Sequence, residues 1–350
     1  MLNTSRAPVR RMAAIGALAL LGSAFATSCQ SGATSYIVVE SSGPTPAVAP
    51  SSVRAVTADS VVNARFKNVN FHMWPGVALE LDELRGRMHS TRSDGVVSFD
   101  DKNSFVLAID TGTVGLRVDD LSRLMNTYVF AYRGAPLKGL TFATDGNHLV
   151  QRGVLHKVVD IPFEMTAEVS ATASSEIRVH PISMKICSIP GQGLMEALGV
   201  TLAKLIDVRQ AKGVRVVDND LLLDPTKLLP PPSIAGHLAA VKVEPGKLVQ
   251  YFASTADRMP SDSLEPDTAA ANYMLFRGGT LQFGKLFMVH ANMQVIDLSP
   301  ADPFDFDISH YDEQLVAGYH RTLANDGLLV FMPDLAKLPP AQRERAAQPK

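Results

Sequence analysis

Apolar and polar residues alternate along much of the chain. Between residues 163 and 170 the odd positions are apolar and include Phe163, Met165 and Val169, whereas the even positions are polar. A period of two residues is that of a strand with one buried face. The same period recurs in the segments 77–81, 105–109, 114–118 and 287–295. Glycine-containing turns join such runs, so the chain is predicted to form long, meandering antiparallel strands.

Two segments have the period of an amphipathic helix instead. In the first, Leu121, Leu124, Met125 and Tyr128 follow the i, i+3, i+4, i+7 pattern after two acidic residues. The second runs from about 193 to 210. Its apolar face carries Leu194, Leu198, Leu202 and Leu205. Many long strands and two helices predict an α+β fold, in which a long curved antiparallel sheet wraps the two amphipathic helices.

Two polar stretches and the end of the chain divide the sequence. Residues 29–60 contain SSGPTPAVAPSS and are predicted to be a flexible linker. Residues 253–271 are predicted to be a second linker, between a β-rich domain with two helices at 61–252 and a β-rich part at 272–335. Residues 336–350 are predicted to be a disordered tail.

The first 28 residues have the three zones of a bacterial secretion signal. A basic zone is followed by an apolar zone at 12–21 and by small residues at 22–28. The apolar zone is shorter than the about 20 residues that a membrane-spanning helix needs. The protein is therefore expected in the periplasm or cell envelope.

Cys29 allows two interpretations. The residues Ala-Thr-Ser-Cys at 26–29 resemble the lipobox of bacterial lipoproteins, with Ala26 where Leu is usual. This resemblance implies that Cys29 is lipidated and attaches the protein to a membrane surface, such as that of the outer membrane. Alternatively, signal cleavage after Ala26 leaves a free thiol, which can form a disulfide with Cys187, the other cysteine of the chain.

Composition and motifs argue against several classes of function. The formal net charge of −2 gives no basic field, so nucleic acid is not an expected partner. The motifs HExxH and GxSxG, a phosphate-binding P-loop and paired CxxC are absent from the sequence. No enzymatic activity, cofactor or metal is therefore predicted. In the densest polar cluster, Asp305, Asp307 and His310 have metal-ligand chemistry, but a turn capped by Asp side chains is the favoured interpretation.

Several long strings carry a resemblance to known proteins. They include VDDLSRLMNTYVFAYRGAPLKGL at 118–140, LHKVVDIPFEMTAEVS at 155–170 and FRGGTLQFGKLFMVHANMQVID at 276–297. They resemble a family of uncharacterised bacterial envelope proteins. The order of the predicted elements is more distantly similar to that of tubular lipid-binding proteins and AsmA-like envelope proteins. This similarity implies a curved sheet around an apolar groove that holds acyl chains.

The predicted function follows from that groove. The protein is expected to bind lipid or another apolar molecule and to catalyse no reaction. The alternative is a structural or protein-interaction module of the envelope without a ligand. The residues predicted to line the groove are the apolar members of two strands and one helix. They are Phe163, Met165, Val169, Leu194, Leu198, Leu202, Phe287, Val289 and Met293.

Overall fold

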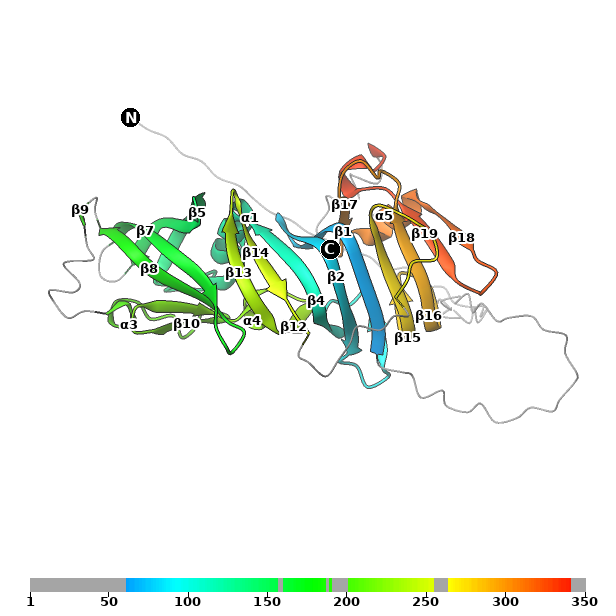
Figure 1. Cartoon of the computed structure of the whole chain (residues 1–350), viewed down its shortest axis with the longest axis horizontal. Coiled ribbons are helices and arrows are strands. Elements are labelled where there is room, and N and C mark those ends of the chain that lie inside the picture. Colours follow the sequence, from blue (N-terminus) through cyan, green and yellow to red (C-terminus); the bar gives the residue numbers. More distant parts are fainter. Residues whose placement is uncertain (1–60, 157–159, 187–188, 191–200, 255–263, 341–350) are drawn as a thin grey trace, which may run out of the picture. The chain divides into compact units, whose positions relative to one another are not determined.

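The computed structural model describes residues 61–156, 160–186, 189–190, 201–254 and 264–340 (Figure 1). The secretion signal, the linker 29–60, Cys29, Cys187, Leu194 and Leu198 lie outside these ranges. Most of the described residues are in strands and few are in helices, and the strands form two large, mainly antiparallel sheets. The predicted α+β class is confirmed in this broad sense, as a fold of many strands with few helices.

The larger sheet has twelve strands. Nine of them lie in the order β13-β14-β4-β2-β1-β15-β16-β19-β18. Their bounds are β1 (Val61–Trp74), β2 (Val77–Ser90), β4 (Phe105–Arg117), β13 (Leu238–Glu244), β14 (Lys247–Phe252), β15 (Tyr273–Phe283), β16 (Leu286–Asp297), β18 (Tyr319–Thr322) and β19 (Leu328–Met332). Three short strands pair with it in parallel: β3 (Val96–Ser98), β12 (Ser233–Gly236) and β17 (Phe304–Asp307).

The smaller sheet has seven strands, and all of its pairs are antiparallel. Six of its strands follow the order β10-β11-β8-β7-β6-β5, and the seventh, β9, pairs with β8. The bounds are β5 (Leu137–Asp145), β6 (His148–His156), β7 (Asp160–Ala171), β8 (Ile177–Ile186), β9 (Ile189–Pro190), β10 (Val214–Val217) and β11 (Asp220–Leu223).

The period of two residues predicted these strands well. The segments at 77–81, 163–170 and 287–295 lie within β2, β7 and β16. The segments at 105–109 and 114–118 belong to the single strand β4, which ends at Arg117, so that Val118 begins a helix instead.

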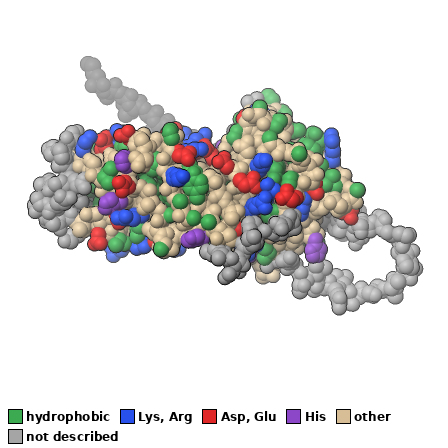
Figure 2. Space-filling model, in the orientation of Figure 1, with side chains coloured by type: hydrophobic (Ala, Val, Ile, Leu, Met, Phe, Trp, Pro, Cys, Tyr) green, Lys and Arg blue, Asp and Glu red, His purple; other side chains and the backbone are tan. Residues whose placement is uncertain are grey.

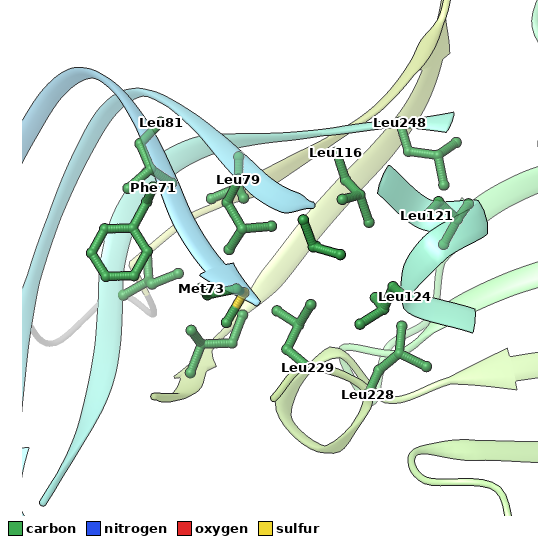
Figure 3. Close-up of a cluster of buried hydrophobic side chains, with 14 of the residues drawn as sticks. Phe71, Met73, Leu79, Leu81, Leu116, Leu121, Leu124, Leu228, Leu229 and Leu248 are labelled. Atoms are coloured by element: carbon green, nitrogen blue, oxygen red, sulfur yellow. The ribbon is translucent and has the colours of Figure 1, made fainter. Parts of the chain in front are cut away.

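The first predicted helix is confirmed. Helix α1 (Val118–Leu124) continues as the π-helical turn η1 (Met125–Val129), and the buried side chains include Leu121, Leu124 and Met125. Leu121 and Leu124 face an apolar cluster that includes Leu228 of the short helix α4 (Pro225–Leu228) (Figure 3). The other helices of the described residues are α3 (Leu202–Leu205), α5 (Tyr311–Ala317) and the 3-10 turn η2 (Leu335–Lys337).

Of the second predicted helix, at 193–210, the described part is helical only in α3, and the prediction is wrong for the described residues on either side of it. Thr201 is extended, with φ −89° and ψ 160°, and α3 ends before Ile206, which is also extended. Beyond it the Asp207 carboxylate accepts a hydrogen bond of 3.1 Å from the backbone N–H of Arg209. Such a local bond competes with the helical bonds of the backbone. Ile206 and Val208 are buried on alternate positions, as in an extended segment.

The predicted division at 253–271 is not a domain boundary. Strand β15 pairs with β1 from Asn63↔Arg277 to Lys67↔Tyr273, so the two β-rich parts share one sheet. Within the predicted linker, Leu264 is 3% exposed and packs with Tyr273 and Leu275. The predicted disordered tail is also ordered at its start, where η2 forms and Leu338 is 1% exposed.

Charged side chains on the twelve-stranded sheet pair with one another. Arg65 donates to Glu83 at 2.7 Å, and Arg87 donates through Nε and Nη2 to the two carboxylate oxygens of Asp110. On the face drawn in Figure 2, acidic and basic side chains lie next to each other. None of the helices in the described ranges is long and apolar enough to cross a membrane.

Candidate apolar binding site

A cavity of about 40 Å³ lies against one face of the seven-stranded sheet. Its described lining comes from β5–β8, β11 and the segment around α3. The lining residues are Leu137, Gln151, Leu155, Ile161, Phe163, Met165, Met184, Ile186, Leu202, Ile206 and Leu221. All of them except Gln151 are apolar, and none is charged.

The register of the sheet brings distant side chains into rows at this cavity. Met165 of β7 lies opposite Gln151 of β6 and Met184 of β8. Four residues farther along β6, Leu155 lies opposite both Leu137 and Ile161. Residues directly opposite one another on a sheet face are in side-chain contact distance, so neighbouring strands supply a continuous apolar wall.

One residue in the middle row of this wall is a glycine and has no side chain. Gly153 lies opposite Phe163, between the rows of Gln151 and Leu155. A Cβ atom at Gly153 would lie 2.7 Å from Leu140 Cδ2 and 3.3 Å from the Phe163 ring. The missing side chain therefore gives the Phe163 ring the room that it occupies.

Polar bonds fix the α3 segment that forms part of the wall. The backbone N–H of Leu202 donates to Asn219 Oδ1 at 2.9 Å, and that of Ala203 donates to the Asp218 carbonyl at 3.0 Å. Asp218 has φ +53°, as the tight turn between β10 and β11 requires. This turn thereby holds Leu202 at the cavity.

Charges next to the cavity stay on the outer face of the sheet. Glu164, which follows Phe163 in β7, accepts hydrogen bonds from Lys185 at 3.0 Å and Arg152 at 2.7 Å. These bonds hold the pKa of Glu164 below its usual value. The alternation of β7 thus separates an ionised outer face from an apolar inner one.

Gln151 is the one polar side chain in the described lining. It is 6% exposed. It also lines a second cavity of about 20 Å³, which shares Leu137 and Leu221 with the first. Sequence analysis missed Gln151, although it occupies an inward position of β6 between Leu149 and Leu155. The sequence does contain a sign of it, because a polar residue at a position of the strand where the alternation calls for an apolar one is unusual.

The predicted groove residues separate into two groups. Phe163, Met165 and Leu202 meet at the cavity, as the groove hypothesis requires. Val169 lies farther along β7 and packs against the apolar core instead. The second group, Phe287, Val289 and Met293, belongs to β16 in the other sheet.

The β16 group does not share one face. Met293 is fully buried, whereas Phe287 is 38% and Val289 is 48% exposed. The cause is a change of phase in the hairpin β15–β16, where Gly279 and His290 have φ +61° and +57°. The pairing register of the two strands is the same on both sides of this point, so the left-handed backbone of these residues, and not a bulge, accompanies the change of face. The sequence signal was the pair Gly278-Gly279 inside a strand.

Of the three residues considered as metal ligands, Asp307 and His310 lie 3.3 Å apart, whereas Asp305 pairs with side chains of β1. Asp305 bonds Asn70 at 3.0 Å and His72 at 3.2 Å. Asp307 instead accepts the backbone N–H of Ser309 at 2.7 Å, which is the capped turn that the sequence favoured. No group of three or more His, Cys, Asp or Glu residues suited to a metal occurs in the part of the chain described.

Comparisons of the chain with protein-family models, curated proteins and solved structures give no match. The resemblance to envelope proteins and to lipid-binding folds therefore stays a prediction.

Proposed function

We propose that this protein is an exported, lipid-anchored envelope protein that binds lipid or another long apolar ligand by taking part of it into the cavity of the seven-stranded sheet. The observation that supports this proposal is the apolar cavity at Phe163, Met165 and Leu202. The side chains around an empty apolar cavity lack part of their van der Waals contacts, and a ligand in the cavity can supply them. At about 24 cal/mol per Å³ of cavity, filling 40 Å³ recovers about 1 kcal/mol.

The size of the cavity limits how a ligand enters. An engineered apolar cavity of about 150 Å³ binds benzene, whereas this one measures about 40 Å³. A long ligand therefore inserts only a few methylene groups unless the wall rearranges. Met165 and Met184 favour rearrangement, because an unbranched thioether side chain changes rotamer easily and adapts to irregular apolar shapes.

The proposed location depends on residues 1–29. Export follows from the three-zone signal, and attachment follows from lipidation of Cys29. A ligand-binding domain tethered by residues 29–60 would stay close to the membrane that holds its apolar ligands. The groups of a bacterial lipoprotein anchor bind a membrane with about 0.8 kcal/mol per buried CH₂.

A cavity-filling variant tests the binding proposal. Leu155→Phe adds a ring at the cavity, and we expect it to weaken binding of a fluorescent monoacylglycerol at least tenfold. Leu107→Phe is the matched control, because Leu107 lines a cavity of about 20 Å³ in the twelve-stranded sheet. Overpacking costs both variants about 1–3 kcal/mol of stability. Equal loss of binding in both, or no binding by the unmodified protein, contradicts the proposal.

The interaction module is a second candidate function. Phe287 and Val289 are exposed on one face of β16, beside each other at the strand's period of two. Exposed large apolar side chains that lie close together are typical of interaction surfaces. Pull-down of an envelope protein that is lost in a Phe287→Ser, Val289→Ser variant, with monoacylglycerol binding absent from the unmodified protein, would favour this candidate.

A further inference from the structure

We infer that the part of the ligand inside the cavity carries an uncharged hydrogen-bonding group, such as a hydroxyl, an ester or an amide, and that the Gln151 side chain binds this group. This inference rests on the proposed function. It narrows the ligand class from apolar molecules in general to those with a neutral polar group within reach of the sheet.

The Gln151 side chain points toward the cavity. Along β6 it shares a face with Leu149 and Leu155, which line the two neighbouring cavities. Its backbone lies opposite Met165, whose side chain is 2% exposed and lines the same cavity. Gln151 itself is 6% exposed. It therefore has apolar neighbours on its own strand and on the next.

The amide of Gln151 has no hydrogen-bond partner within the described residues. Two other buried glutamine side chains are fully paired. Gln294 exchanges two hydrogen bonds with the backbone of Thr268, at 3.1 and 2.9 Å. Gln314 donates to two carbonyl oxygens and accepts a backbone N–H. A buried amide without a partner is destabilising compared with Leu. The Gln250 side-chain oxygen also lacks a partner, but Gln151 is the unpaired amide that lines this apolar cavity.

Water is a poor partner for this amide. A cavity of about 40 Å³ has room for water, but a buried water needs two to four polar partners. The described lining offers a single polar side chain. A ligand can bring its own polar group and fill the rest of the cavity with methylene groups.

The same lining excludes an ionised ligand group. None of the described lining residues carries a charge, and an unpaired charge in an apolar site is strongly unfavourable. The Gln151 amide both donates and accepts. A hydroxyl, ester or amide therefore fits, whereas a carboxylate or phosphate does not.

Methyl NMR of the methionines tests this inference on the exported full-length protein. Met165 and Met184 line the cavity and report binding directly, and Met274 and Met293 in the other sheet report whether the fold is kept. The probes are 1-hexanol, n-hexane and hexanoate at neutral pH. We expect 1-hexanol to bind the unmodified protein and hexanoate to bind at least tenfold more weakly.

The decisive variant is Gln151→Leu, with Gln151→Met as a second variant that keeps the unbranched chain if the first does not fold. We expect either change to weaken 1-hexanol binding about tenfold, which is about 1.4 kcal/mol, and to leave n-hexane binding unchanged or tighter. Equal 1-hexanol binding by the variant and the unmodified protein overturns the role of Gln151 while cavity binding stands. Absence of any probe-induced shift at Met165 and Met184 of the unmodified protein overturns the proposed function itself.

Discussion

Enlarging the cavity should strengthen the binding of a small apolar ligand. Met165 is 2% exposed and lines the cavity. Truncation of a buried Met to Ala destabilises a protein by about 2–5 kcal/mol. We expect Met165→Ala to lie in this range, since the new space joins an existing void of about 40 Å³. Met293→Ala is the matched control, because Met293 is fully buried in the twelve-stranded sheet.

The assay is urea unfolding of both variants with and without 1-hexanol. A ligand at ten times its Kd stabilises a folded protein by about 1.4 kcal/mol. At ten times the Kd of Met165→Ala we expect such a gain for that variant and a smaller one for Met293→Ala, which keeps the cavity at its original size. An equal effect of 1-hexanol on both variants, or no effect on Met165→Ala, would refute the assignment of this cavity as the binding site.

Three further predictions concern the fold, its pH dependence and the anchor. Gly279→Ala should lower the Tm more than Gly146→Ala, because both have positive φ but only a Cβ at Gly279 collides with the backbone of β1; equal Tm losses would argue against the close approach. Burial raises the pKa of Asp305, but hydrogen bonds from His72 and Asn70 outweigh it and keep this pKa below the usual value. The resulting stability is present above about pH 4 and is lost as pH falls through the folded-state pKa. Urea unfolding from pH 6 to pH 2 should therefore show a smaller loss for Asp305→Asn than for the unmodified protein, and parallel curves would contradict this. Cys29→Ser should release the exported protein from the membrane fraction, as followed by immunoblotting, and a variant that stays membrane-bound was not held there by a lipid on that thiol.

The strands could be predicted because apolar and polar residues alternate along a strand that has one buried face. In β7, Met165 is buried, whereas Glu164 on the other face pairs with Arg152 and Lys185. The same local information could not predict pairing between remote segments. The contact of β1 with β15, such as Asn63↔Arg277, joins residues that no local pattern connects.

The sequence-based predictions were wrong at two places where the backbone conformation does not follow the spacing of the apolar residues. The positive φ values at Gly279 and His290 reverse the faces of β15 and β16, which exposes Phe287 and Val289. In the predicted second helix, the backbone is extended at Ile206, and the local hydrogen bond at Asp207 follows it.

The site was predictable only in part. Phe163, Met165 and Leu202 were named from their apolar phase, and they meet at one cavity. Periodicity gives the inward face of each strand, but it does not give which inward faces surround a void. Met184 and Gln151 join the site through the register of β6, β7 and β8, which is a property of the assembled sheet.

Native mass spectrometry of the protein purified without detergent tests the central claim most directly. We predict a second species, heavier than the protein alone by the mass of one neutral lipid or similar apolar molecule, and loss of that species in Leu155→Phe but not in Leu107→Phe. Repeated detection of the protein mass alone, together with no uptake of added fluorescent monoacylglycerol, would contradict the claim that this cavity binds a ligand.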